Sequence, residues 1–260
     1  MMNNLSDMIW IELHKAIRSK MPLATALGSL FMPAGIAFLI FVSKNPEISQ
    51  KLGLISAKAE LVAYSATDWT TYLALLGQMI AAGGFFIFVL VTSWVFGREF
   101  ADGTLKDMLA VPVRRSSILL AKFILVAVWS AVLSMEMLIF GLVMGAVVQL
   151  QGGSSGVVLQ AAALVLITAG LVIAAILPFA LFASAGRGYL LPLGMAVLTL
   201  MMANFAAVVG WGEYFPWTVP GLFAQGKTPL TPASYFIVVL TGLLGMLATH
   251  AWWMRTDQSK

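Results

Sequence analysis

The residues best suited to chemistry lie in a polar stretch, residues 97–122, which reads GREFADGTLKDMLAVPVRRSSILLAK. Within it Thr104 and Asp107 stand three positions apart, the spacing of a capping box, in which side chains satisfy free backbone N–H groups at the start of a helix. A short helix over residues 105–111 is therefore expected. Pro112 ends it, because proline disfavours helical geometry in the residue before it. Such a helix offers a surface that can dock on another surface.

The expected helix has two different faces. The apolar face comprises Leu105, Met108, Leu109 and Val111, and the charged face comprises Lys106 and Asp107. A helix this short is marginal alone in water, so it needs a supporting surface, either the membrane domain of this chain or another protein. Two interpretations are open: a docking element for a partner, or a solvated basic loop that fixes the orientation of the chain in a membrane.

Two polar residues inside long apolar runs are further candidates. Glu136 is an acid at a depth where charge is costly, so it either meets a cationic substrate, takes part in proton-linked motion, or packs between helices as a protonated or hydrogen-bonded side chain. Asn204 either packs against a neighbouring helix or lines a substrate pathway. A nearby stripe of small residues indicates close helix packing, within the chain or at a dimer contact. It comprises Ser130, Ser134, Gly141 and Gly145.

Catalytic and cofactor chemistry is not expected in this chain. An intramembrane enzyme needs clustered nucleophiles, carboxylates or histidines, whereas the chain has two histidines, His14 and His250, and no cysteine. No metal site is expected either. Residues 221–228 fit the nucleotide-binding pattern G-x-x-x-x-G-K-[ST], but this motif requires a strand before it and a helix after it. Prolines flank it on both sides, so we predict no nucleotide binding there.

The composition predicts the structural elements that hold these residues in place. Hydrophobic residues make up 60 % of the chain and charged residues 10 %, with a mean hydropathy of +0.94, whereas a soluble domain carries about 25 % charged residues. Six apolar runs reach the roughly 20 residues that a helix needs to cross a bilayer, where the backbone must satisfy its own hydrogen bonds. They cover residues 23–42, 74–96, 119–148, 157–184, 189–209 and 234–254. The prediction is an all-α integral membrane protein with a single domain, residues 1–260.

The distribution of basic residues predicts the orientation. With the N-terminus in the cytoplasm, eleven basic residues lie inside and four lie outside, namely Lys44, Lys51, Lys58 and Lys227. This bias follows the positive-inside rule and places both termini in the cytoplasm. The net charge of +4 is thus a topology signal, and no nucleic-acid partner is expected.

Two segments outside the spans have distinct patterns. Residues 1–22 carry apolar side chains at helical spacing, opposite Asp7, Glu12, Lys15 and Arg18, which predicts a helix in the cytoplasmic interface with its charges toward water. It either anchors the chain or touches a cytoplasmic partner. The outer segment 210–233 mixes aromatic residues with prolines; an interfacial or re-entrant element is one interpretation of this mixture.

The loop also carries a family resemblance. The run Glu99, Gly103, Thr104, Leu105, Leu109, Pro112, Arg115 and Lys122 resembles the signature loop of type-2 ATP-binding-cassette (ABC) exporter permeases, where it likewise lies between the second and third of six spans. The interfacial helix and the apolar segment before the sixth span also resemble that family. The small size of the chain is most similar to the bacitracin and lantibiotic immunity branch.

This resemblance implies a permease that acts as a dimer, with itself or a homologous permease, in a bacterial plasma membrane, in contact with its lipids. Two cytoplasmic P-loop ATPase subunits would bind ATP and Mg²⁺, and residues 97–118 would form the coupling loop. The implied coupling residues are Glu99, Gly103, Thr104, Leu105, Met108, Leu109, Pro112 and Arg115. The expected substrate is an amphipathic peptide, antibiotic or lipid-like molecule moved outward. The alternative is a non-catalytic assembly factor or scaffold, including an ABC-type permease for cofactor maturation.

Overall fold

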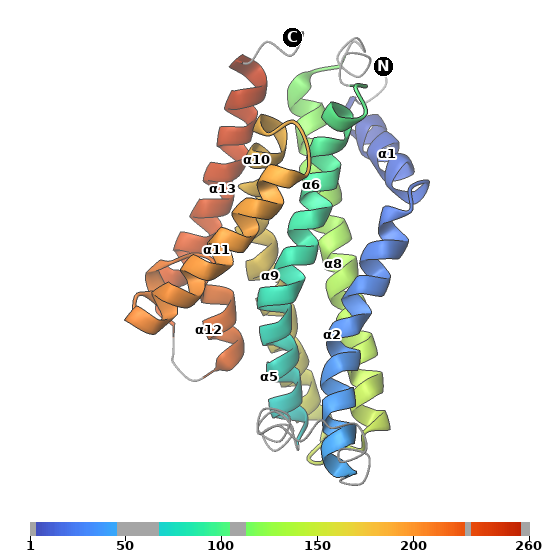
Figure 1. Cartoon of the computed structure of the whole chain (residues 1–260), viewed down its shortest axis with the longest axis vertical. Helices are drawn as coiled ribbons and strands as arrows, with labels where there is room; N and C mark the ends of the chain where they lie inside the picture. Colours follow the sequence, from blue (N-terminus) through green and yellow to red (C-terminus); the bar gives the residue numbers. More distant parts are fainter. Residues whose placement is uncertain (1–3, 46–67, 105–112, 227–229, 256–260) are drawn as a thin grey trace.

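The computed structural model describes residues 4–45, 68–104, 113–226 and 230–255, and the structural statements below concern these residues. They form an all-α bundle (Figure 1). Six helical segments are long and apolar enough to cross a membrane, which confirms the predicted fold class. They are Met21–Val42, Trp69–Ala101, Arg115–Val147, Ser155–Ala185, Leu190–Val209 and Pro232–Arg255.

The described residues form twelve helical elements. In chain order they are α1 (Asn4–Ile17), α2 (Met21–Lys44), α5 (Trp69–Met79), the π-helix η1 (Ile80–Gly84), α6 (Phe85–Ala101), α8 (Arg115–Val147), α9 (Ser155–Ile176), α10 (Phe179–Ala185), α11 (Leu190–Val209), the 3-10 helix η2 (Gly212–Tyr214), α12 (Val219–Gln225) and α13 (Pro232–Arg255). Helix α1 begins and α13 ends at the same end of the bundle (Figure 1), which we call the terminal end. The end of α6 and the start of α8 lie there too.

Two of the spans are interrupted. In the second, η1 separates α5 from α6, and such single-turn π segments are frequent at functional sites. In the fourth, α9 stops at Ile176 and Pro178 precedes α10, because proline lacks the N–H that would continue the hydrogen-bond ladder.

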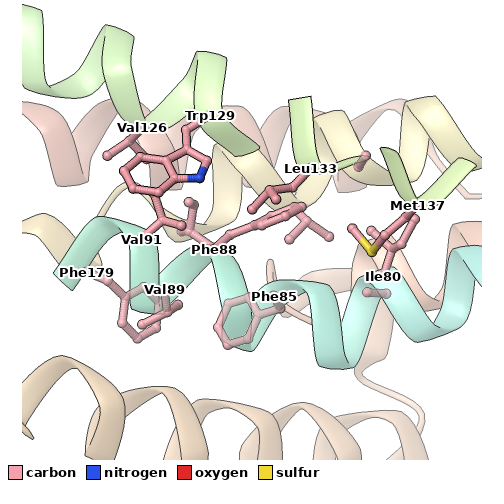
Figure 2. Packing of buried hydrophobic residues seen from close by; sticks show 14 of the residues in the cluster. Ile80, Phe85, Phe88, Val89, Val91, Val126, Trp129, Leu133, Met137 and Phe179 are labelled. Carbon is pink, nitrogen blue, oxygen red and sulfur yellow. The ribbon is translucent and has the colours of Figure 1, made fainter. Parts of the chain in front are cut away.

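The core is built where α6 packs against α8 and α10. Figure 2 shows Phe88 and Val91 of α6 facing Trp129 and Leu133 of α8. Phe85 meets Phe179 of α10 edge to face, with ring centroids 5.4 Å apart. These aromatic contacts hold the broken fourth span against the second one.

The stripe of small residues on α8 packs within the chain. Tyr72 of α5 donates a hydrogen bond to the carbonyl of Gly141 at 3.0 Å. A Cβ at Gly141 would lie 2.7 Å from Leu76, and one at Gly145 would lie 2.6 Å from Trp69. Glycine therefore lets α5 approach α8 closely, as the sequence pattern indicated.

The chain after α11 folds back against the spans. Gly210 ends α11 in the left-handed conformation, with φ of 86°, and α12 then packs on α5 and α9. The Trp217 indole N–H donates to the carbonyl of Ala175 at 2.9 Å, and the Thr218 hydroxyl donates to that of Ala203 at 3.1 Å. The described part of the 210–233 segment thus includes the helices η2 and α12, and it contacts the second, fourth and fifth spans.

Candidate functional site

Four charged side chains meet where α1, α6 and α8 converge at the terminal end. Lys122 is fully buried, and its Nζ lies 2.9 Å from each carboxylate oxygen of Glu99 and 3.2 Å from Oε2 of Glu12. Lys15 lies 2.9 Å from Oε1 of Glu12 and 3.3 Å from Oε1 of Glu99. We call these four residues the charge cluster.

The charge cluster is neutral and hydrogen-bonded throughout. Its two lysines balance its two glutamates, and Lys122 also donates to the carbonyl of Val95 at 2.8 Å. Burial of a charge is costly unless it is paired and its hydrogen bonds are satisfied. Because the partners come from three helices, the cluster is satisfied only when α1, α6 and α8 keep this arrangement.

The spacing of residues along α1 explains why the charged side chain of Glu12 lies in the interior of the bundle. Met8, Glu12 and Ala16 recur every four residues, so they lie on one face of the helix, and all three are buried. Met8 packs on Ile118 and Ala121 of α8. The sequence-based expectation that Glu12 and Lys15 face water is therefore wrong.

The opposite face of α1 is apolar and exposed. Trp10, Leu13 and Ile17 are all exposed, and Trp10 stacks on His14 with ring centroids 4.6 Å apart. In a membrane, apolar side chains are as favourable toward lipid tails as toward protein. Helix α1 therefore exposes Trp10, Leu13 and Ile17 and turns Met8, Glu12 and Ala16 toward the other helices.

A second contact ties the start of α8 to the end of α13. Arg115 donates from Nη1 to the carbonyl of Trp253 at 3.1 Å, where a cation satisfies one of the free carbonyls at a helix C-terminus. Trp253 is itself buried, and its indole N–H donates to the Ser184 hydroxyl at 2.9 Å. Its ring also packs edge to face on Phe100 of α6.

Two glycines bring the turn before α11 against α6. A Cβ at Gly97 would lie 2.8 Å from the carbonyl oxygen of Gly188, so only glycine permits this approach. In the same turn, burial raises the pKa of the Tyr189 phenol, and the negative charge of Asp102 adds to the effect. Both effects favour the neutral phenol. Nearby, the Arg98 guanidinium lies over the Trp94 ring, 4.7 Å from its centroid, and the Arg98 Nε lies 3.7 Å from Oδ2 of Asp102.

The described part of the predicted loop consists of its two ends. Glu99 belongs to the charge cluster and Arg115 binds the end of α13. Gly103 has a φ of +70° just after α6, the left-handed position at which glycine ends a helix, and Thr104 follows in the same turn. The other predicted coupling residues, Leu105, Met108, Leu109 and Pro112, lie outside the described residues.

Three members of the charge cluster were not among the predicted site residues. Lys122 stood in the family-like run but had no assigned role, and Glu12 and Lys15 were placed on a solvent face. A signal existed: Glu99 and Lys122 have opposite charges at the two ends of one loop between apolar runs. The third span begins at Arg115 after Arg114, without a side-chain cap.

A polar cavity of about 260 Å³ lies between the π-helix η1, α11 and α12. Its polar lining comes from Gln78, Asn204, Thr218 and Gln225. Asn204 hydrogen-bonds only to its own helix among the described residues, at the carbonyl of Leu200 at 2.8 Å. The other pathway candidate, Glu136, is on α8 beside α2 and does not line this cavity, so the structure does not bring the two together.

Neither a metal-ligand cluster nor a phosphate-binding loop around Gly221 is found among the described residues. No group of three or more potential ligands is placed to hold a metal ion there. Gly221 of the nucleotide-binding pattern lies within α12, a helix, and not in a phosphate loop. Lys227 and Thr228 lie outside the described residues.

Six apolar spans, with buried ion pairs joining the helices on either side of the connection between the second and third, define an all-α multi-pass membrane protein. Comparison with known proteins agrees: residues 8–204 match the ABC-2 family transporter protein. The chain is also 27 % identical over 174 residues to the bacitracin transport permease protein BCRB of Bacillus licheniformis, covering 66 % of this chain and 84 % of that protein. The chain belongs to the ABC-2 transporter family and is a transmembrane transporter permease.

Proposed function

We propose that this chain is the membrane subunit of an ATP-driven exporter and that the loop between α6 and α8 docks on a separate ATPase. The observation that carries the proposal is the charge cluster, which joins both ends of this loop to α1. A loop held in this way transmits a force to three helices at once. The family to which the chain belongs supports the presence of an ATPase partner.

The charges at the two ends of the bundle support a cytoplasmic position for the loop. Nine described basic residues lie at the terminal end, whereas Lys44 lies at the other end, where it donates to the carbonyl of Val148 at 2.7 Å. The positive-inside rule then assigns the terminal end to the cytoplasm. Both termini face the ATPase side of a bacterial plasma membrane in this proposal, with the lipids of that membrane around the spans.

The proposed mechanism starts with two ATPase subunits that bind ATP and Mg²⁺ and close on each other. Their closure pushes the loop, and the charge cluster moves α1, α6 and α8 as one body. Helix α6 continues through η1 into α5, and η1 lines the polar cavity. Movement of the loop therefore changes the cavity that α11 and α12 complete. The assembly has two permeases, either two copies of this chain or this chain and a homologue.

The proposed substrate is an amphipathic peptide or antibiotic, moved outward. The similarity to a bacitracin transport permease supports this class. The polar cavity, with Asn204 on its wall, accepts polar groups of such a molecule, while its apolar surface contacts the surrounding spans. Glu136 lies apart from this pathway.

Co-purification tests the proposal. The tagged chain, extracted from its native host in mild detergent, should carry a P-loop ATPase in near-equal amount by mass spectrometry. Leu105→Glu and Met108→Glu should each remove the ATPase, because they place charge on the apolar face of the expected loop helix. Lys106→Glu, on the charged face, is the matched control and should retain it.

Two results would contradict the proposal. Recovery of the chain alone, under conditions that preserve other membrane complexes, would favour the scaffold or assembly-factor alternative. Normal ATPase binding and normal substrate stimulation in both Leu105→Glu and Met108→Glu would show that the coupling surface lies elsewhere.

A further inference from the structure

An apolar groove runs along the outer side of α8, where α1 and α2 pack beside it. Its first part, a hollow of about 260 Å³, lies between the bend that joins α1 to α2 and the stretch of α8 that begins at Leu125. Its second part, a hollow of about 580 Å³, continues along α8 to Val143. Both hollows are lined by Val132 and Glu136. We call this continuous feature the α2–α8 groove.

The length and the apolar lining of the α2–α8 groove suit an alkyl chain. From Leu125 to Val143 the helix rises about 27 Å at 1.5 Å per residue, close to the roughly 30 Å thickness of the hydrocarbon core. Val132, in the middle, is 60 % exposed, so the groove opens away from the core of the bundle and toward lipid. The second hollow, of about 580 Å³, is within the size range of small-molecule sites, and both hollows have the mostly apolar lining with few polar groups that is typical of such sites.

Glu136 is the single charged residue that lines the groove. Its Oε2 lies 3.4 Å from the Ser29 hydroxyl, but that hydroxyl lies 2.8 Å from the carbonyl of Ala26. Serine has one proton to donate, and the shorter contact takes it. Among the described residues no basic side chain pairs with Glu136. An ionised Glu136 therefore lacks the partner that a carboxylate at membrane depth requires.

We propose that the α2–α8 groove binds a hydrophobic amine from the membrane, with its ammonium group on Glu136 and its alkyl chain along α8. The charge of the ligand follows from the unpaired carboxylate, and its shape follows from the length of the groove. Glu136 lies about 16 Å along α8 from Leu125, deeper than the headgroup of an ordinary phospholipid. The site shares no lining residue with the polar cavity.

Thermal unfolding of the purified chain in phosphatidylcholine nanodiscs tests this proposal, with dodecylamine as the probe and dodecanol as its neutral counterpart. A ligand that binds the folded state raises the unfolding midpoint in a concentration-dependent way. Dodecylamine should raise the midpoint and dodecanol should not. Glu136→Gln keeps the size and the contact with Ser29, and it should raise the dodecylamine concentration for half-maximal effect at least about tenfold, because the charged partner is lost.

A second variant tests the alkyl part of the site. Val132→Trp fills the junction of the two hollows and should abolish the shift with dodecylamine. Leu198→Trp places the same bulk on the exposed side of α11, outside the groove, and should leave the shift intact. An unchanged response in either Glu136→Gln or Val132→Trp would overturn the proposal.

The alternative occupant to be tested for this face is a second copy of this chain. The native chain has no cysteine, so Val132→Cys gives a single thiol in the groove. Absence of an oxidative cross-link in native membranes, with thiol labelling by a membrane-soluble maleimide, agrees with a lipid-facing site. An efficient disulfide cross-link between two copies of the Val132→Cys variant would show that protein covers the groove and would overturn the proposal. None of these measurements needs ATP or an ATPase, so they can fail while the exporter function stands.

Discussion

Lys122 donates to both carboxylate oxygens of Glu99, each at 2.9 Å, and these two residues stand at opposite ends of the loop between α6 and α8. The contact prevents the two helices from separating where the loop leaves them. Glu12 adds α1 to the same contact at 3.2 Å. A push on the loop is therefore transmitted to a unit of three helices, and the first predictions concern this unit.

Lys122→Met is expected to destabilise the chain strongly. It leaves the buried carboxylates of Glu99 and Glu12 to share Lys15, and removal of one partner of a buried ion pair typically costs about 3–5 kcal/mol. The free energy of unfolding in mixed detergent micelles measures the loss. Lys20→Met, at an exposed position, is the control and should change it by less than about 0.5 kcal/mol.

Combining Lys122→Met with Glu99→Gln should restore part of the stability that Lys122→Met loses. The double variant no longer buries an unpaired charge at Glu99, so the two effects are expected to be non-additive, as for residues in direct contact. Strict additivity of the two unfolding free energies would contradict a direct interaction between Lys122 and Glu99. This result would also remove the main support for a three-helix unit.

Gly97→Ala is expected to disturb the contact between α6 and the turn before α11. Its Cβ would lie 2.8 Å from the Gly188 carbonyl oxygen, a backbone atom that cannot rotate away, and overpacking of this kind costs about 1–3 kcal/mol. Gly194→Ala is the matched control, since nothing lies within 4 Å of its Cβ position. The difference between their unfolding midpoints is the measurement. Equal stability of the two variants would show that the turn does not pack on α6.

The sequence predicted the spans well because hydropathy and length are local properties. It failed on α1 for a physical reason. Amphipathic spacing shows that a helix has two faces but not which face meets protein, and α1 exposes Trp10 while it buries Glu12. The partners that bury it, Glu99 and Lys122, are remote in sequence.

The sequence did not predict the π-helix or the polar cavity either. Asn204 could be identified as a candidate because a polar residue in an apolar run is unusual. Its companions could not be: Gln78 lies on another span, and Thr218 belongs to the fold-back that ends in α12. Their proximity depends on how α11 and α12 turn back, which involves long-range packing.

Arg115→Met should separate a structural role from contact with an ATPase. The variant keeps the apolar stem of the side chain but loses the hydrogen bond to the Trp253 carbonyl, and hydrogen bonds of charged groups contribute about 1.5–3 kcal/mol. We expect a lower unfolding midpoint and retained co-purification with the ATPase. Arg114→Met, at the exposed neighbour, should leave the midpoint unchanged. Loss of the ATPase at normal stability would instead place Arg115 at the partner surface.

Asn204→Leu should impair transport without affecting folding. Asn204 is exposed, and among the described residues its amide bonds only to the Leu200 carbonyl one turn earlier, so its replacement leaves no buried polar group unpaired. Leucine nevertheless replaces a polar wall of the cavity with an apolar one, and a substrate group bound there loses its hydrogen bonds. The measurement is the substrate-stimulated ATP hydrolysis of the reconstituted complex, with the unfolding midpoint recorded in parallel. Leu198→Val, on the exposed side of the same helix, is the control and should retain full stimulation. Because Asn204→Leu keeps the charge cluster and the loop intact, basal hydrolysis should stay normal while the stimulated component falls. Full stimulation in Asn204→Leu would mean that the substrate does not depend on Asn204 and would contradict the proposed pathway through this cavity.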